Sequence, residues 1–238
     1  RPYKNTCMRP AETGIPLMGT PRLYDISRTV SPTLAVWPGD APFVAEHVLR
    51  LRDGASVNLT TLTLSAHTGS HADAPYHVVD GGPHPADLLL APYLGPAHLV
   101  TVARRAGGLV PDDLAGHDLS GMRRLLIRTW VSDLPDDVWP ENFPHPTIAL
   151  VDWLAAHGAV LLGLDSPSAD AFDSTELPCH HRLWEQGMVH LESLRLVGMP
   201  DGVYELIALP LKLAGVCGSP VRAVLRELCA PSGEPGER

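Results

Sequence analysis

The chain has 238 residues, enough for one large domain or two small ones, and its formal net charge is −9 at pH 7. This acidic balance argues against nucleic acid or an anionic membrane as the main partner, because both are bound through clustered lysine and arginine. The four cysteines lie far apart without C-x-x-C spacing, so neither a disulfide framework nor a structural zinc knuckle is indicated, and no stretch approaches membrane-spanning length. We therefore expect a cytoplasmic protein with no membrane segment.

A single domain is predicted over residues 22–229, since no internal repeat or linker divides this stretch. Residues 1–21 are polar, rich in proline and glycine and without periodicity, which indicates a flexible leader. Residues 230–238 are mainly proline, glycine and charged residues, and they are predicted to form a disordered tail.

The domain is predicted to begin with a short strand at 23–26. Trp37 comes next, beside the turn residues Pro38 and Gly39. Its indole could be a buried core side chain or a wall for a planar ligand, and periodicity does not separate the two.

Residues 61–66 alternate threonine or serine with leucine or alanine, which predicts a half-buried strand. The next eleven residues, 67–77, contain three histidines and a carboxylate. Imidazole and carboxylate groups suit zinc and its neighbours, and clustering at two- and four-residue intervals favours a metal site over scattered surface histidines. The candidate residues are His67, His71, Asp73 and His77.

Two ligands of one ion must come close together, which constrains the backbone between them. His67 and His71 would lie roughly 13 Å apart in an extended chain, so the chain must fold back between them. Gly69 lies at the midpoint, and a helix is disfavoured because Gly69 and Pro75 are poor helix formers. We expect a strand end, a bend at Gly69, and a rigid exit at Pro75 that sets the direction of His77.

The middle of the chain alternates strand and helix patterns. Strands are predicted at 99–102 and 125–129, and apolar residues at helical spacing predict a helix over 147–157, ended by Gly158. A continuous apolar run at 159–164 follows and is typical of a strand buried on both faces. These elements predict an α/β fold.

A second polar cluster follows this strand. His180 and His181 begin a short helix predicted over 180–186, and Glu192 lies in a strand-like apolar run. A carboxylate among apolar neighbours is costly to bury unless it is paired or binds a metal, but Glu192 could also face outwards on an edge strand.

The last predicted elements are a strand at 204–211 and a helix. Ser219 and Pro220 have the features of a helix start, and the helix would place four apolar residues on one face. These are Val221, Val224, Leu225 and Leu228.

The stretch 67–77 reads H-x-G-x-H-x-D-x-P-x-H, and over about residues 24–228 the sequence resembles the bacterial kynurenine formamidase (arylformamidase) branch of the cyclase-like metal-dependent hydrolases. Further segments typical of that branch are found at 36–40, 163–168, 206–212 and 219–222. The resemblance implies a swivelling β/β/α-type fold, with a mixed, barrel-like sheet and flanking helices, in a homodimer.

The resemblance also implies roles for individual residues. His67, His71 and Asp73 would bind one metal ion, with Asp73 also touching a second. His180 would bind the second ion and Glu192 would bind both. His77 would be the general acid/base, and Trp37 would line the aromatic part of the substrate.

The implied reaction is hydrolysis of N-formyl-L-kynurenine to L-kynurenine and formate, in tryptophan degradation by the kynurenine pathway. Two zinc ions, or manganese, would activate water and polarise the formyl carbonyl. No G-x-S-x-G motif is present for a serine-hydrolase route. Two alternatives remain open: a hydrolase of a cyclic amide such as isatin, and a non-catalytic ligand- or metal-binding protein with the same fold.

Overall fold

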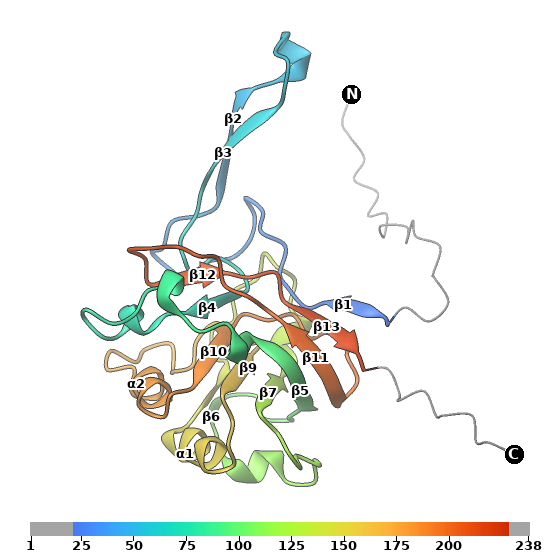
Figure 1. Cartoon of the computed structure of the whole chain (residues 1–238), viewed down its shortest axis with the longest axis vertical. Helices are drawn as coiled ribbons and strands as arrows, with labels where there is room; N and C mark the ends of the chain where they lie inside the picture. The colour runs from blue at the N-terminus through green and yellow to red at the C-terminus, as the bar shows by residue number, and fades with distance from the viewer. Residues whose placement is uncertain (1–20, 229–238) are drawn as a thin grey trace, which may run out of the picture.

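The computed structural model describes residues 21–228, so that residues 1–20 of the expected leader and the whole expected tail lie outside the described residues (Figure 1). The described residues form a mixed sheet of nine strands in the order β1-β13-β11-β5-β7-β9-β10-β4-β12. Its strands are β1 Leu23–Asp25, β4 His71–Asp73, β5 Leu94–Thr101, β7 Arg124–Arg128, β9 Leu161–Leu164, β10 Val189–Glu192, β11 Gly202–Ile207, β12 Gly218–Pro220 and β13 Val224–Glu227. The predicted single-domain α/β fold is confirmed, as a curled sheet with few helices.

The centre of the sheet is parallel and its flanks are antiparallel. β5, β7, β9 and β10 pair in parallel, whereas β11 and β4 join this group in antiparallel register. All four residues of β9 are buried, as predicted from its continuous apolar sequence. Leu161 of β9 belongs to one hydrophobic cluster and Leu162 and Leu164 belong to another, so the sheet has a core on each face.

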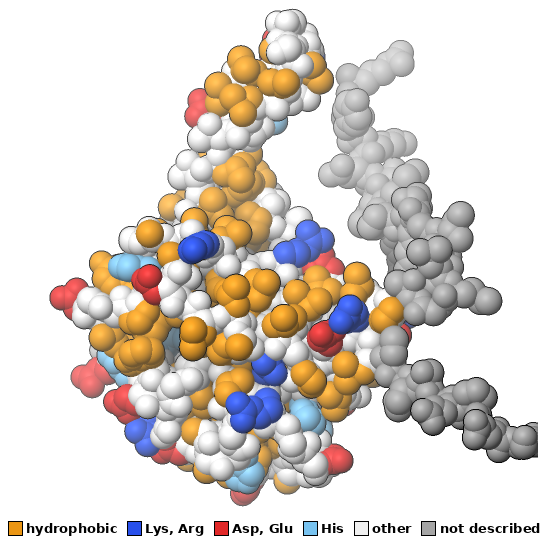
Figure 2. All heavy atoms as spheres, viewed as in Figure 1, with side chains coloured by type: hydrophobic (Ala, Val, Ile, Leu, Met, Phe, Trp, Pro, Cys, Tyr) orange, Lys and Arg blue, Asp and Glu red, His pale blue; other side chains and the backbone are white. Residues whose placement is uncertain are grey.

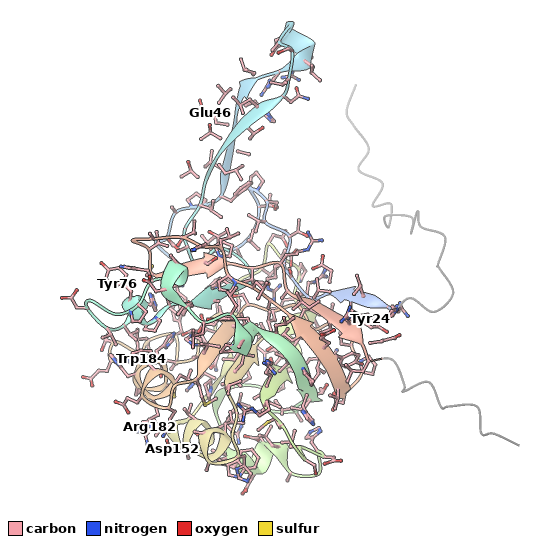
Figure 3. All side chains as sticks on the ribbon, viewed as in Figure 1. Tyr24, Glu46, Tyr76, Asp152, Arg182 and Trp184 are labelled. Carbon is pink, nitrogen blue, oxygen red and sulfur yellow. The ribbon has the colours of Figure 1, made fainter. Side chains whose placement is uncertain are left out.

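Two α-helices pack together beside the parallel strands (Figure 1). α1, Ile148–Ala156, confirms the predicted helix, and the Thr147 hydroxyl caps it by accepting a hydrogen bond from the Leu150 N–H. α2, Pro178–Glu185, begins with a proline and precedes Gly187 at φ +65°. Arg182 of α2 donates to Asp152 of α1 at 2.6 Å, and Figure 3 labels both. Neither helix is long and apolar enough to cross a membrane.

The helix predicted after Ser219 is wrong, because Ser219 and Pro220 lie in β12 and Val224 and Leu225 lie in β13. Ser219 pairs with Ala72 of β4, and its hydroxyl accepts a hydrogen bond from the Leu211 N–H at 2.7 Å. β13 lies between β1 and β11 and receives hydrogen bonds on both sides. Tertiary pairing therefore overrides the helical spacing of the apolar residues. Pro220 is tolerated because β12 is the edge strand of the sheet.

Residues 61–66 were predicted to form a half-buried strand, but only 61–63 are in a strand and these are exposed, whereas 64–66 follow the strand and are half-buried. Strand β3, Leu59–Thr63, pairs with β2, Val44–Leu49, and every residue of β3 is exposed. The β2–β3 hairpin projects from the body of the molecule as a long arm (Figure 1).

The other elements are short. A third sheet pairs β6, Gly107–Leu109, with β8, Pro144–Pro146. Six 3₁₀ turns of three or four residues connect the strands in the described chain. They are η1 Leu51–Asp53, η2 Pro75–His77, η3 Pro85–Asp87, η4 Ala91–Tyr93, η5 Pro111–Leu114 and η6 Trp130–Asp133.

Candidate metal centre

The histidine-rich segment folds back on itself at Gly69, as the sequence predicts. Gly69 has φ +67°, and a Cβ there would lie 3.2 Å from Val30 Cγ2, so a larger residue would be strained and crowded. The chain then enters β4 with His71 and Asp73 on the same face, two residues apart. Pro75 begins η2, which carries His77.

Strand pairing brings Glu192 to the same place. In the antiparallel pairing of β10 with β4, Glu192 lies directly opposite His71. Glu192 is buried, and its carboxylate accepts a hydrogen bond from the Ala169 N–H at 2.7 Å. Ser193 follows at φ +55°, a conformation that non-glycine residues rarely adopt, and its carbonyl accepts a hydrogen bond from the Ser70 hydroxyl at 2.8 Å. This contact ties the end of β10 to the bend before β4.

Helix α2 supplies His180. Leu177, the residue before the helix, has φ +45°, and the buried Asp170 carboxylate accepts hydrogen bonds from the N–H groups of Cys179 and His180. Asp170 also accepts the Nδ1 proton of His180 at 2.6 Å, which directs Nε2 into the cluster. His181 is exposed, so the structure brings His180 rather than its neighbour to the centre.

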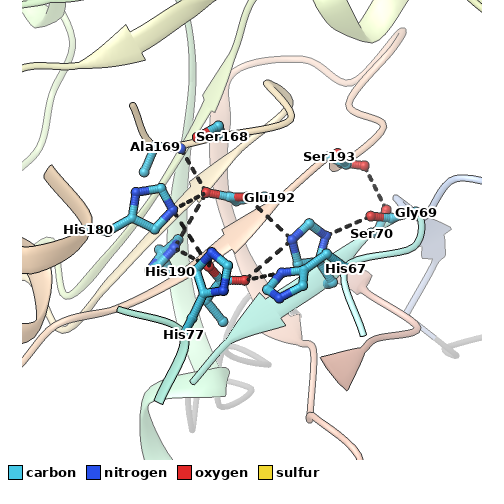
Figure 4. Close-up of polar contacts among 12 residues, drawn as sticks. His67, Gly69, Ser70, His77, Ser168, Ala169, His180, His190, Glu192 and Ser193 are labelled. Carbon is cyan, nitrogen blue, oxygen red and sulfur yellow. Dashed lines mark hydrogen bonds and ion pairs between the residues drawn. The ribbon is translucent and has the colours of Figure 1, made fainter. Parts of the chain in front are cut away.

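Two carboxylates lie between two groups of histidines (Figure 4). On one side, Asp73 Oδ1 is 2.9 Å from His67 Nδ1 and 3.4 Å from His71 Nε2. Glu192 Oε2 is 3.3 Å from the same His71 nitrogen. On the other side, His180 Nε2 is 3.6 Å from Asp73 Oδ2 and 3.3 Å from Glu192 Oε1. Each carboxylate therefore presents one oxygen to each side.

Two side chains of the cluster were not identified from the sequence. Asp170 lies in a loop ten residues before His180, and no local pattern singles it out. His190 is buried in β10, with Nε2 3.4 Å from both Asp73 and Glu192. A signal was available for His190, because residues two apart on a strand share a face and Glu192 was already a candidate.

The polar atoms of the cluster are better suited to binding a metal ion than to hydrogen bonding with one another. Both oxygens of Asp73 and the Nε2 atoms of His71 and His190 are buried without a hydrogen-bond partner among the described residues. Such orphaned polar atoms are costly unless a ligand or water satisfies them. His71 already donates Nδ1–H to the Gly69 carbonyl at 2.8 Å, which leaves Nε2 as a free lone pair. Groups drawn from His67, His71, Asp73, His180, His190 and Glu192 could thus hold metal ions.

Burial and neighbouring charges shift the pKa values of the cluster. Burial opposes ionisation of Asp73, yet His67 and the other imidazoles hold the pKa of Asp73 well below its usual value. His77 behaves differently, because burial and the neighbouring His67 and His180 lower its pKa to about 4. A neutral His77 imidazole at neutral pH can accept a proton.

The cluster opens into a cavity of about 360 Å³, with Trp37 on its wall. Trp37 is half-buried, and its ring lies 5.5 Å from that of Trp139 and 5.1 Å from that of Phe172. The turn expected at Pro38 and Gly39 is present, with the Asp40 N–H donating to the Trp37 carbonyl at 2.9 Å. Of the two interpretations of Trp37, the structure supports the cavity wall.

The sequence was compared with protein families and with known proteins. A family described as "Putative cyclase" matches residues 24–171. A kynurenine formamidase of Salinibacter ruber is 45% identical over 210 residues, covering 88% of this chain and 99% of the relative. The chain belongs to the putative cyclase family. Another family relative, the kynurenine formamidase of Bacillus cereus, is 40% identical over 211 residues, covering 89% of this chain and all of that protein.

Solved structures of similar fold include two hydrolases. A predicted metal-dependent hydrolase from Bacillus stearothermophilus is 25% identical and has a TM-score of 0.75, covering 87% of this chain and 99% of its own. Isatin hydrolase A from Labrenzia aggregata is 24% identical with a TM-score of 0.75, covering 88% of this chain and 95% of its own. At 24% identity, the similarity to isatin hydrolase A shows a shared fold and no more.

Proposed function

We propose that this chain is a metal-dependent amidohydrolase that converts N-formyl-L-kynurenine and water into L-kynurenine and formate, a step of tryptophan degradation. The observation that carries the proposal is the convergence of His71, Asp73, His180 and Glu192 beside an aromatic-walled cavity. The similarity to kynurenine formamidases, over 88–89% of this chain, supports the choice of substrate.

The proposed cofactor is a pair of zinc ions, with manganese as the alternative metal. His67 and His71 would hold one ion and His180 the other, while Asp73 and Glu192 would contribute to holding both. When bound, such ions lower the pKa of water towards neutrality and polarise a carbonyl group.

The protein groups then have distinct tasks in amide cleavage. The aromatic ring of the substrate would pack against Trp37, which orients the formyl group towards the carboxylates. His77, whose Nε2 is 3.8 Å from Asp73 Oδ2 and whose side chain is 31% exposed, would move a proton from the attacking water to the departing aromatic amine. The C–N bond breaks as the amine is protonated, and the formyl carbon leaves as formate.

A substrate comparison tests this function. The purified chain, loaded with zinc or manganese, is expected to hydrolyse N-formyl-L-kynurenine with a kcat/KM at least about 100-fold above that for isatin, a preference of about 2.7 kcal/mol in transition-state binding. Formation of kynurenine and disappearance of isatin are both followed by absorbance. Equal or faster turnover of isatin would assign the cyclic amide instead, and turnover of neither would favour the non-catalytic binding protein. A cytoplasmic location stays a prediction from the cysteine pattern.

We also propose that the chain acts as a homodimer in which a partner covers the β2–β3 arm. Seven large apolar side chains of the arm are 42–57% exposed, and they extend along it in Figure 2. They are Val44, Val48, Leu49, Leu51, Val57, Leu59 and Leu62. An isolated two-stranded hairpin is marginally stable in water, and a contiguous apolar surface of this kind is typical of an interface. A dimer would also explain why the alternating sequence pattern predicted a half-buried strand here. One face of the strand would be buried against the second copy of the chain.

The double substitution Leu59→Lys with Leu62→Lys is expected to convert the dimer to a monomer, because it places two charges in the proposed interface. Size-exclusion chromatography with light scattering measures the mass. The control is Leu89→Lys, since Leu89 is 79% exposed and lies outside the arm. A wild-type monomer at micromolar concentration, or an unchanged mass in the double variant, would contradict the proposal.

A further inference from the structure

The two sides of the cluster are built alike, and this likeness gives His190 a role. The rings of His67 and His71 lie 5.0 Å apart at 86° to each other, and those of His180 and His190 also lie 5.0 Å apart at 86°. Asp73 faces both pairs, and Glu192 faces His71 on the first side and both histidines on the second. His190 thus occupies on the second side the position that one histidine of the pair 67 and 71 occupies on the first.

The distances around His190 are those of a ligand set. Four donors at the corners of a tetrahedron, each about 2.0–2.1 Å from a central zinc ion, lie about 3.3–3.4 Å from one another. His190 Nε2 is 3.4 Å from Asp73 Oδ2 and 3.4 Å from Glu192 Oε1. His180 Nε2 lies 3.6 Å and 3.3 Å from these same two oxygens. In Figure 4 both imidazoles approach the Glu192 carboxylate.

A purely structural role accounts less well for these contacts. An N–H···O hydrogen bond has a donor–acceptor distance of about 2.7–3.2 Å, and the His190 contacts are longer. His190 Nε2 is buried and has no hydrogen-bond partner among the described residues, although two carboxylate oxygens face it. An ion between these atoms would satisfy all of them at once.

We propose that His190 is a ligand of the second metal ion, so that this ion is held by two histidines and two carboxylates. On the first side, His67, His71 and Asp73 form the corresponding group, and Glu192 Oε2 lies 3.3 Å from His71 Nε2. The inference rests on the proposed metal centre, and it is independent of which amide is the substrate.

Metal binding to the metal-free chain tests the proposal directly. The chain is stripped with a chelator and titrated with Zn²⁺ by calorimetry and with Co²⁺ by visible absorption, which reports coordination geometry. We expect two ions per wild-type chain. In His190→Ala and His190→Gln, affinity for one of the two ions is expected to fall by more than the about 10–100-fold that follows loss of an outer-shell partner. His181→Ala, which removes an exposed histidine of α2, is the matched control and is expected to bind both ions normally.

Two further measurements distinguish a metal ligand from a structural residue: rescue of the variant by added imidazole, and thermal unfolding of the metal-free protein. A cavity of about 80 Å³ lies on this side of the cluster and is lined by Asp73, His180 and His190. Added imidazole is therefore expected to restore the cobalt spectrum of His190→Ala, while the metal-free variants melt close to the metal-free wild type. Two ions bound with unchanged affinity and spectrum in both variants would overturn the role of His190. The proposal would also be overturned if the variants bound no ion and were unfolded in the metal-free state, because His190 would then be a structural residue. A wild-type chain that binds no ion would refute the metal centre itself.

Discussion

Replacing Glu192 with glutamine is expected to abolish hydrolysis and to reduce the metal content from two ions per chain to one or none. Glu192 Oε2 faces His71 and Oε1 faces His180, so one substitution weakens both ligand sets. Metal activation supplies several kcal/mol of transition-state stabilisation, so kcat/KM is expected to fall by at least about 10³-fold. Elemental analysis of the dialysed protein and formamidase assays measure the two effects.

The matched control is Glu185→Gln, which makes the same chemical change on the outer side of α2. Glu185 is 58% exposed and pairs with Arg182, and such surface pairs contribute little to stability. This variant is expected to keep both ions and full activity. A Glu192→Gln chain that keeps two ions and near wild-type turnover would show that Glu192 does not bridge the metals.

The clustered histidines and the carboxylate of residues 67–77 could be identified as metal-ligand candidates from the sequence. The bend at Gly69 follows from chain geometry alone, since His67 and His71 cannot converge in an extended strand. The burial of Glu192 was one of two open interpretations, and only the pairing of β10 with β4 decides it. Register between strands more than 100 residues apart cannot be read from spacing.

The features that the sequence did not predict correctly also depend on tertiary contacts. Asp170 acts through a hydrogen bond to His180, and nothing in the intervening residues indicates it. Residues 221–228 have helical spacing, yet pairing of β13 with β1 and β11 makes part of this segment a strand. The exposure of β3 was also unpredictable, because an alternating pattern indicates burial of one face without telling which chain covers it.

Replacing His77 with alanine is expected to reduce kcat for N-formyl-L-kynurenine by about 10²–10⁴-fold, the usual contribution of a general acid/base. His77 lies 3.8 Å from the nearest Asp73 oxygen, on the turn that Pro75 begins, and belongs to neither of the carboxylate-bridged ligand sets. Metal content is therefore expected to stay at the wild-type value, in contrast to Glu192→Gln. His157→Ala, at the exposed end of α1, is the control and is expected to leave both quantities unchanged.

The leaving group provides a second measure of the proton transfer by His77. An N-formyl aniline with electron-withdrawing ring substituents releases a less basic amine, which needs less protonation as the C–N bond breaks. The defect of His77→Ala is therefore expected to shrink along a series of such substrates, while that of Glu192→Gln stays large because attack on the carbonyl is still impaired. A His77→Ala defect that is equal for all leaving groups would place His77 outside the protonation step, and unchanged hydrolysis with normal metal content would remove it from catalysis.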